Sequence, residues 1–340
     1  MQTPLNASSG GYAYLERKDQ ARTARVAIVG AGHVGATTAY ALLISGTVAE
    51  IVLVDKDTAR AEGQVYDLRD AALFSHTTRV RAGDYSDCCD VDVIIITAGV
   101  SQAPGMTSRL DDLKQSAGIL KEIVEEIACH NPRGVLLLAS NPVDVLTYAA
   151  WKWSRLPAGQ VIGSGTSLDT ARFRWRLGER YGVAPENVHA YIIGEHGDSQ
   201  VAVLSSARVA GIPLGDFCRQ VDLPYEEDAL KHIAEETRKA GLEIIHAKGA
   251  TFYGIGAALV RIVTAILRDE RAVLTVSSLV PASMELGEVF LSLPAIVGSS
   301  GVVRVLSIPL SQHEEEALRK SADILKRYIA TLDQGAATAV

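Results

Sequence analysis

The segment "RVAIVGAGHVG", residues 25–35, joins a short apolar run to three glycines in the spacing GxGxxG. This pattern is typical of a buried strand that turns tightly into a helix. Gly30, Gly32 and Gly35 would let the pyrophosphate of a dinucleotide approach the backbone amides that open the helix. The segment therefore predicts a dinucleotide-binding turn, although glycine-rich turns are too common for this motif to decide the fold alone.

The next predicted strand, "EIVLVD" at residues 50–55, adds a more specific signal. It ends in Asp55, twenty residues after Gly35. A carboxylate at this place accepts hydrogen bonds from ribose hydroxyls and repels a 2′-phosphate, which favours NAD over NADP. The alternative explanation is a glycine turn beside an aspartate that caps the following helix.

Apolar runs and longer amphipathic stretches alternate along the first half of the chain. The runs at 90–99 and 134–140 are mostly apolar, which indicates strands buried on both faces of a parallel sheet. After residue 166 the alternation is lost, which favours an α+β arrangement. We therefore predict an α/β protein with a Rossmann doubly wound parallel sheet at 25–166, an α+β substrate-binding catalytic domain at 167–335, and a tail or subunit-contacting arm at 1–24.

Size and composition exclude several classes of protein. A chain of 340 residues suits two domains. The net charge of −7 argues against binding to nucleic acid or to an anionic membrane. The apolar stretches are too short to span a bilayer, and the first 24 residues lack the apolar run of a secretory signal. The four cysteines have no metal-ligand spacing, so we expect reduced thiols, a cytoplasmic protein and no metal site.

Two further loops follow predicted strands, "TAG" at 97–99 and "ASNPVD" at 139–144. Ligands of a parallel α/β sheet bind beyond the carboxyl ends of its strands, so both loops should line the cofactor groove. Asn141 should lie near the nicotinamide end of that groove. The alternative is that Asn141 only caps the helix that begins near Pro142.

Three segments carry side chains suited to chemistry. In "IIGEHGDSQ", residues 192–200, His196 stands in a glycine-bracketed turn, where it is either a core histidine or a catalytic one. In "SLDTARFRWRL", residues 167–177, Asp169 and Arg172 share a helical face. Such a pair is usually a weak surface salt bridge, but in a cleft Arg172 could bind a carboxylate while Asp169 orients a histidine. Arg109 ends a loop rich in proline and glycine, which suits a mobile lid.

Together with "KGATFYGI" at 248–255, these motifs resemble, in order, the L-lactate dehydrogenase family of NAD-dependent 2-hydroxy-acid dehydrogenases from about residue 25 to about residue 330. The resemblance implies the reversible reduction of pyruvate to (S)-lactate by NADH. It implies that His196 is the proton donor and acceptor, oriented by Asp169. It further implies that Arg172 grips the substrate carboxylate and that Arg109 polarises the carbonyl that is reduced.

The resemblance also implies the residues that surround the two ligands. Thr251 would pack on the substrate methyl group, and Ile255 would pack on the nicotinamide face. The implied substrate pocket contains Gln102, Arg109, Asn141, Arg172 and Thr251. The implied cofactor groove contains Gly30, Gly32, His33, Val34, Gly35, Asp55, Tyr85, Thr97, Ala98, Gly99, Ala139, Asn141, Ser164 and Ile255.

Gln102 favours lactate over malate, because the resemblance places it where malate dehydrogenases carry an arginine. Without that cation, a C4 diacid would bury an unpaired carboxylate. Counted back from Arg109, the same position falls on Ala103, because this chain has one residue more than the family pattern between Gln102 and Arg109. The alternatives are a malate dehydrogenase, a broader L-2-hydroxyacid dehydrogenase that accepts bulkier 2-oxo acids, and a non-catalytic NAD-binding structural protein.

Arg174 and His189 match the phosphate-binding positions of bacterial family members that fructose 1,6-bisphosphate activates. The resemblance implies a homotetramer in which the bisphosphate bridges two subunits. An arginine fork and a histidine suit a phosphate dianion. Taken singly, each residue is explained as well by a solvated surface position.

Overall fold

The computed structural model describes residues 24–99, 109–130 and 132–337. Among these residues lies a nine-stranded sheet with the order β12-β11-β10-β6-β5-β4-β1-β2-β3. The strands from β6 to β3 are parallel, and β10, β11 and β12 continue the sheet in antiparallel orientation. The strands of this sheet are β1 (Arg25–Val29), β2 (Glu50–Val54), β3 (Arg79–Ala82), β4 (Val93–Ile96), β5 (Val135–Leu138), β6 (Val161–Gly163), β10 (Ala272–Leu279), β11 (Phe290–Gly298) and β12 (Gly301–Val305).

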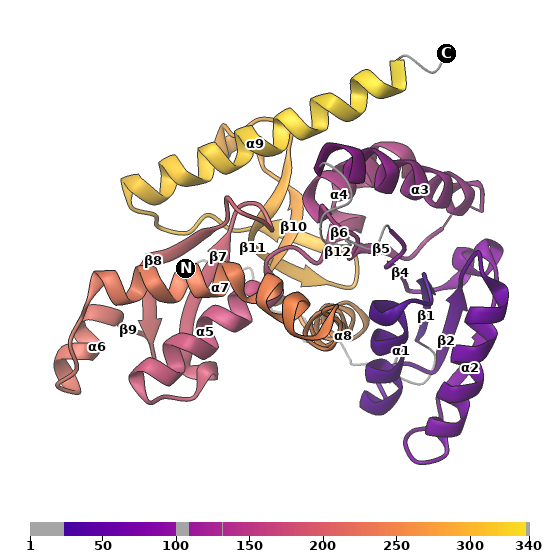
Figure 1. Ribbon diagram of the computed structural model, residues 1–340, viewed down its shortest axis with the longest axis horizontal. Coiled ribbons are helices and arrows are strands. Elements are labelled where there is room, and N and C mark those ends of the chain that lie inside the picture. Colours follow the sequence, from indigo (N-terminus) through magenta and orange to yellow (C-terminus); the bar gives the residue numbers. More distant parts are fainter. Residues whose placement is uncertain (1–23, 100–108, 131, 338–340) are drawn as a thin grey trace, which may run out of the picture.

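The helices cover both faces of this sheet and extend beyond one end of it (Figure 1). None of the helices in the described ranges is long and apolar enough to cross a membrane. The helices are α1 (His33–Ser45), α2 (Thr58–Ala72), α3 (Arg109–Cys129), α4 (Val143–Ser154), α5 (Ser167–Tyr181), α6 (Leu214–Gln220), α7 (Glu227–Lys248), α8 (Tyr253–Leu267) and α9 (Gln312–Ala337).

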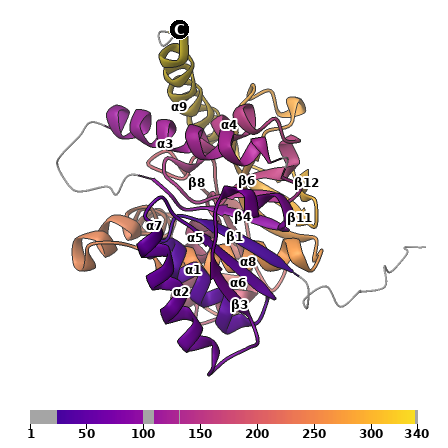
Figure 2. The same cartoon turned by 90° about the vertical axis from the view of Figure 1, so that its right-hand side faces the viewer.

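Successive residues of the central strands point to opposite faces of the sheet. Val26 and Ile28 of β1 belong to the core formed with α1, α2 and α8, whereas Ala27 and Val29 belong to the core formed with α3 and α4. Figure 2 shows α3 and α4 above the sheet and α1 and α2 below it. Because both faces are buried, the central parallel strands β4 and β5 are continuous apolar runs, as the sequence predicted.

A smaller antiparallel sheet of β7 (Val188–Ile193), β8 (Val201–Val209) and β9 (Ile212–Pro213) lies beside α5 and α7. Helix α8 lies between this part of the molecule and α1 (Figure 1). The packing of α8 on α1 is close, since a Cβ on Gly256 would lie 2.9 Å from Thr37 Cγ2. This packing brings the break between α7 and α8 beside the glycine-rich turn.

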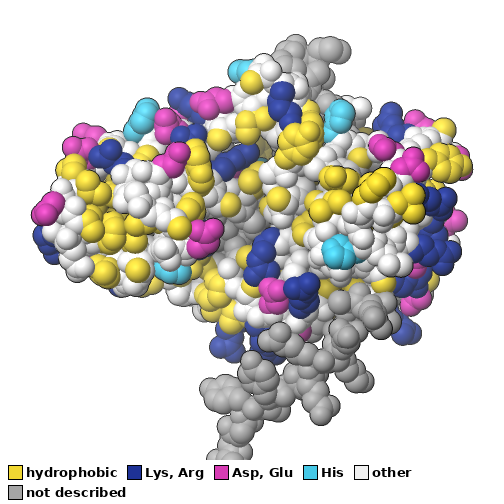
Figure 3. All heavy atoms as spheres, turned by 90° about the horizontal axis from the view of Figure 1, so that it is seen from below, with side chains coloured by type: hydrophobic (Ala, Val, Ile, Leu, Met, Phe, Trp, Pro, Cys, Tyr) yellow, Lys and Arg dark blue, Asp and Glu magenta, His cyan; other side chains and the backbone are white. Residues whose placement is uncertain are grey.

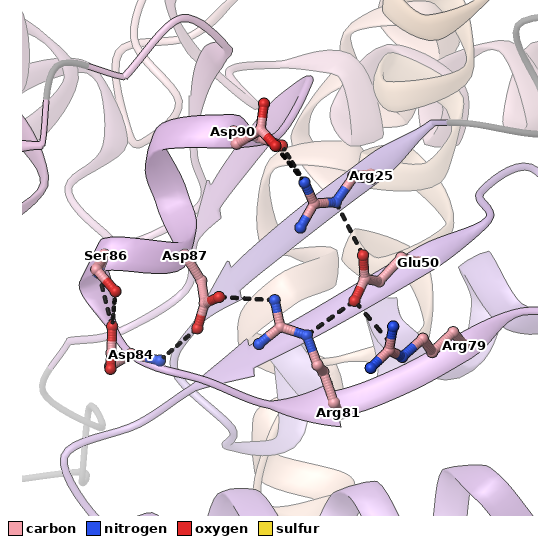
Figure 4. Close-up of polar contacts among 8 residues, drawn as sticks. All are labelled: Arg25, Glu50, Arg79, Arg81, Asp84, Ser86, Asp87 and Asp90. Carbon is pink, nitrogen blue, oxygen red and sulfur yellow. Dashed lines mark hydrogen bonds and ion pairs between the residues drawn. The ribbon is translucent and has the colours of Figure 1, made fainter.

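An ion-pair network joins β1, β2 and β3 near their amino ends (Figure 4). Glu50 accepts hydrogen bonds from Arg25 Nε and from Arg81 Nε, both at 2.8 Å. Arg81 also donates to Asp87 at 2.7 Å, which adds the short helical turn after β3 to the network. Burial alone would raise the pKa of Glu50, but the hydrogen bonds from Arg81 and Arg25 hold it below its ordinary value. The network thereby fixes β2, the strand that Asp55 follows.

Two features of the fold differ from the expectation drawn from the sequence. Strands β10, β11 and β12 belong to the second half of the chain, yet they extend the sheet of the first half instead of forming a sheet of their own. The edge strand β3 was not predicted, because its sequence "RVRA" buries only Val80. Both differences arise from pairing between strands, which local sequence does not encode.

Candidate active site

The turn between β1 and α1 requires glycine at two of its three glycine positions. Gly30 has a φ of +106°, and a Cβ there would lie 2.8 Å from the backbone nitrogen of Ala98. A Cβ on Gly35 would lie 1.9 Å from the carbonyl oxygen of Gly30. Gly32 is the N-cap of α1, and a Cβ there would meet nothing within 4 Å. The start of α1 is therefore open to a pyrophosphate, whose oxygens its first amides can bind.

Asp55 is hydrogen-bonded to this turn. Its Oδ2 accepts the N–H of Ala31 at 2.7 Å, and its Oδ1 accepts the N–H of Asp57 at 2.9 Å. The N-cap of α2 is Asp57, so helix capping does not account for Asp55. Thr97 donates its hydroxyl to the carbonyl of Gly30 at 2.9 Å, which ties the end of β4 to the same turn. The arrangement fits the ribose and the pyrophosphate of NAD.

Asn141 follows β5 and has an exposed side chain. The N-cap of α4 is Pro142, which makes no side-chain cap hydrogen bond, so Asn141 is not the helix cap that the sequence left as an alternative. Ser164, the residue after β6, is buried, and its N–H donates to the carbonyl of Leu138 at 2.7 Å. The end of β5 and the residue after β6 thus meet at the same edge of the sheet.

The other predicted cofactor residues come from five places in the fold. Burial raises the pKa of Tyr85, which opens a short helical turn after β3. His33 and Val34 begin α1, Ala98 and Gly99 follow β4, Ala139 follows β5, and Ile255 lies in the first turn of α8. Their positions agree with the rule that parallel α/β sheets bind ligands beyond the carboxyl ends of their strands.

His196 and Asp169 meet from two different elements. Asp169 lies in the first turn of α5, and His196 lies in the loop between β7 and β8. His196 Nδ1 lies 2.6 Å from Asp169 Oδ2, and Arg172 Nη1 lies 3.4 Å from Asp169 Oδ1. The Asp169 side chain is 4% exposed, whereas that of His196 is 29% exposed. The carboxylate is thus shielded from water, while the imidazole retains an accessible face.

The charges at this pair favour a protonated imidazole. Burial alone would lower the pKa of His196, but the charge of Asp169, its hydrogen bond and the charge of Asp144 outweigh burial and raise the pKa to about 9. Burial also opposes the ionised form of Asp169, yet His196 and Arg172 hold its pKa below the ordinary value. An imidazole whose protonated form is favoured in this way can donate a proton to a group on its accessible face.

Asp144 is a second carboxylate at the site, which the sequence analysis did not assign. It lies in the first turn of α4 and is 2% exposed. Its Oδ2 accepts the backbone N–H of His196 at 2.7 Å. Burial raises the pKa of Asp144 to about 6, although Ser277 and the N–H of His196 favour its charged form. The available signal was an aspartate within the apolar helix start "NPVDVL", because a carboxylate is rarely buried without a partner.

Helix α7 lies close to Arg172, and the break between α7 and α8 carries Thr251. A Cβ on Gly241 of α7 would lie 4.0 Å from Arg172 Nη1. Thr251 is half-buried in the break between α7 and α8. Gln102 and the side chain of Arg109 lie outside the described residues, although α3 begins at Arg109.

Arg174 lies on α5 against β7, the strand that carries His189. Arg174 Nε donates to the carbonyl of Ala190 at 3.0 Å, and its guanidinium carbon lies 5.2 Å from the centre of the Tyr191 ring. Burial lowers the pKa of Arg174. His189 is exposed on β7, opposite Arg208 of β8. The Arg174 guanidinium therefore packs on the strand that carries His189, and Arg208 adds a second cation.

Comparisons with known proteins agree over both halves of the chain. The family model of the lactate/malate dehydrogenase NAD binding domain matches residues 24–163, and that of the lactate/malate dehydrogenase alpha/beta C-terminal domain matches residues 166–335. The fold places these two regions around the Asp55 turn and the His196–Asp169 pair respectively.

Among curated proteins, the chain is 47% identical over 316 residues to a probable L-lactate dehydrogenase of Schizosaccharomyces pombe, covering 93% of this chain and 95% of that protein. It is 47% identical to the L-lactate dehydrogenase of Acetivibrio thermocellus over 309 residues, covering 91% and 97%. Among solved structures, the minor L-lactate dehydrogenase of Enterococcus mundtii is 41% identical with a TM-score of 0.87, covering 92% of this chain and 99% of that one. The chain belongs to the lactate/malate dehydrogenase family.

Proposed function

We propose that this protein is an NAD-dependent L-lactate dehydrogenase, which reduces pyruvate to (S)-lactate and also catalyses the reverse reaction. The observation that carries the proposal is the contact of 2.6 Å between His196 Nδ1 and Asp169 Oδ2, with Arg172 beside the same carboxylate. Relatives named L-lactate dehydrogenase support the same function.

In the proposed reaction His196 donates its proton to the oxygen of the pyruvate carbonyl. Asp169 keeps the ring in place and stabilises the imidazolium before the transfer. Arg172 binds the pyruvate carboxylate with paired hydrogen bonds, and Arg109 stabilises the negative charge that develops on the carbonyl oxygen. NADH, when bound, supplies the hydride. In the reverse direction, neutral His196 accepts the proton of the lactate hydroxyl.

The direct test follows the loss of NADH absorbance after pyruvate is added to the wild-type protein and to His196→Asn. The wild type should oxidise NADH, and the variant should keep its NADH affinity while losing about 10²–10⁴-fold in turnover, which is typical of a general acid. A variant as fast as the wild type would remove His196 from its role. A wild type that binds NADH but reduces no 2-oxo acid would favour the non-catalytic NAD-binding alternative.

The preference for pyruvate is the part of the proposal that rests on the lid. Gln102, a neutral amide, leaves the second carboxylate of oxaloacetate without a cation. Thr251 supports the same preference, because it would narrow the pocket around a methyl group. Gln102→Arg should shift the preference from pyruvate towards oxaloacetate. If Ala103→Arg produces that shift instead, the extra lid residue precedes the specificity position, and a malate or broader 2-hydroxyacid enzyme becomes the better description.

The proposal also includes activation by fructose 1,6-bisphosphate. Two observations support it. Arg174 of α5 bonds to β7, the strand that carries His189, and Arg208 of β8 lies opposite His189. A phosphate dianion would accept hydrogen bonds from these side chains and offset the positive charge of the two arginines. Pyruvate saturation should shift to lower concentration with the bisphosphate in the wild type and should not shift in Arg174→Gln. Identical curves in the wild type with and without the bisphosphate would remove the effector from the proposal.

We further propose a homotetramer, because large apolar side chains are exposed on two separate parts of the molecule. Tyr40, Tyr66 and Phe74 are exposed on or near α1 and α2, and Trp175 and Leu242 are exposed on α5 and α7. The view from below shows apolar side chains, in yellow, over both halves of that face (Figure 3). Exposed aromatic side chains of this size are enriched at subunit interfaces. Analytical ultracentrifugation should give a mass about four times that of the chain, which is 36.2 kDa.

The same proposal divides the chain into a Rossmann domain at 25–166 and a catalytic domain at 167–335, and it places the protein in the cytoplasm. The ranges of the two family models support the division. The free state of all four cysteines, Cys88, Cys89, Cys129 and Cys218, suits a reducing compartment. The predicted arm at 1–24 lies outside the described residues except for Ala24.

A further inference from the structure

An aromatic stack connects the glycine-rich turn to the break between α7 and α8. Phe252, the N-cap of α8, stacks on the imidazole of His33, with ring centres 5.3 Å apart and ring planes inclined by 25°. His33 is the first residue of α1 and lies next to Gly32, in the turn that is open to a pyrophosphate. The ring of Phe252 therefore stands at the edge of the cofactor site.

A lysine ammonium is held on this stack. Lys248 Nζ lies 3.6 Å from the centre of the Phe252 ring and 4.2 Å from the centre of the Tyr253 ring. The two rings meet edge to face at 4.5 Å, so together they form a corner that receives the cation. A cation over an aromatic face is attracted by the electron density of the ring. Phe252 and Tyr253 thus keep the charge of Lys248 near the turn.

The glycine-rich turn of the cofactor site has no cation of its own to face a pyrophosphate. A dinucleotide brings two negative charges on its pyrophosphate, and the amides of α1 offer only partial positive charge. Neither the glycine-rich turn at 30–35 nor the segment at 97–108 contains a lysine or an arginine. Asp55, which is bonded to the turn, adds a further negative charge. The positive charge of a lysine within reach of the turn would offset this excess of negative charge.

We propose that Lys248 binds the pyrophosphate of the dinucleotide, and that Phe252 holds its ammonium in position for this contact. A lysine suits the role because its flexible stem lets the compact charge reach a phosphate oxygen while the ammonium stays beside the ring. The inference concerns cofactor binding alone, so it holds or fails without reference to which 2-oxo acid is reduced.

The experiment is a binding titration without substrate. The affinities of NADH, ADP-ribose and adenosine are measured for the wild type and for Lys248→Met, which keeps the apolar stem and removes the charge. NADH and ADP-ribose both contain the pyrophosphate and should bind about tenfold more weakly to the variant. Adenosine lacks the pyrophosphate and should bind equally to both proteins. The loss should shrink as salt is added, because ions screen an exposed charge pair.

Two further variants separate this role from a structural one. Lys248→Arg should restore most of the NADH affinity, since it restores the charge. Lys239→Met is the matched control, because this lysine lies on the same helix and pairs with Glu235 at 2.9 Å; its NADH affinity should equal that of the wild type. Unchanged NADH affinity in Lys248→Met, or an equal loss for adenosine, would overturn the proposal.

The contribution of Phe252 is tested with a double-mutant cycle. Phe252→Leu removes the ring that holds the ammonium, so it should weaken NADH binding. In that background, Lys248→Met should reduce the NADH affinity by a much smaller factor than it does in the wild type. Full additivity of the two losses would show that Phe252 does not position Lys248. Circular dichroism of each variant confirms that the fold is kept.

Discussion

At the scale of single residues, two carboxylates favour the protonated form of His196. Asp169 bonds its ring and Asp144 bonds its backbone N–H. Because these contacts raise the pKa of His196 to about 9, the imidazolium should persist through neutral pH. We expect kcat/KM for pyruvate to stay level from pH 6 to pH 8 and to fall around pH 9, while kcat/KM for lactate rises over the same range. A fall in pyruvate reduction centred near pH 6.5, the ordinary histidine value, would contradict this electrostatic account.

Asp144→Asn tests the second of these acids. The amide oxygen can still accept the N–H of His196, but the negative charge is lost, so the pKa of His196 should decrease. The break in the pH profile of pyruvate reduction should move to lower pH by about one unit. Ser277→Ala is the control, because it alters the surroundings of Asp144 and keeps the carboxylate itself. A break at the same pH in Asp144→Asn and in the wild type would show that this charge does not act on His196.

Arg172→Lys should affect substrate binding and leave cofactor binding almost unchanged. An ammonium cannot form the two parallel hydrogen bonds that a guanidinium makes with a carboxylate. We expect the KM for pyruvate to rise by about 10²-fold, whereas the Kd for NADH, measured by fluorescence, stays within about twofold. If the affinity for NADH falls as far as that for pyruvate, Arg172 supports the cofactor site or the fold instead.

The sequence predicted the meeting of Asp169 and Arg172, because residues three apart share a helical face. It did not predict the partnership of Asp144 and His196, which lie 52 positions apart and touch through a side chain and a backbone amide. A contact of this kind leaves no periodic pattern. The positions of Gln102 and Arg109 stay predictions.

At the scale of elements, the network around Glu50 holds the strands that present the cofactor edge. Glu50→Gln should lower the free energy of unfolding by about 1–2 kcal/mol at pH 7, because Arg25 and Arg81 lose the charge of their shared partner. The pKa of Glu50 lies below its ordinary value of 4.5 in the folded protein. Its stabilising contribution is therefore complete above pH 4.5 and is lost as the pH falls through the lowered value.

Urea unfolding at a series of pH values from 7 to 3 measures this effect. The difference between the wild type and Glu50→Gln should be constant down to about pH 5 and should close in more acidic solution. A difference that stays the same at pH 3 would mean that the variant acts through packing and not through charge.

Most elements could be predicted from the sequence because their apolar patterns are strong. The fully buried runs of β1, β4 and β5 and the long amphipathic helices follow directly from such patterns. Edge strand β3 could not be predicted, since four residues with one buried side chain carry no period. The antiparallel pairing of β10 with β6 involves the single residue pair Ser277–Gly163, a tertiary contact without a local signal.

At the scale of the whole molecule, α8 joins the two halves of the chain because it packs on both α1 and α5. Its packing on α1 places the break that carries Thr251 beside the glycine-rich turn, and a Cβ on Gly254 of α8 would lie 3.2 Å from Leu168 Cδ1 of α5, the helix that carries Asp169. A substrate carbonyl and a nicotinamide ring can then be held together between the two halves of the chain, as the proposed hydride transfer requires.

The central claim is that this arrangement reduces pyruvate with NADH in preference to other 2-oxo acids. The most direct test compares kcat/KM with NADH for pyruvate, oxaloacetate and a branched 2-oxo acid under the same conditions. We predict that pyruvate is reduced most efficiently, by about tenfold or more over each competitor, since a misplaced charge or excess volume costs at least about 1.4 kcal/mol at the reacting centre. Oxaloacetate or the branched acid reduced more efficiently than pyruvate would contradict the assignment.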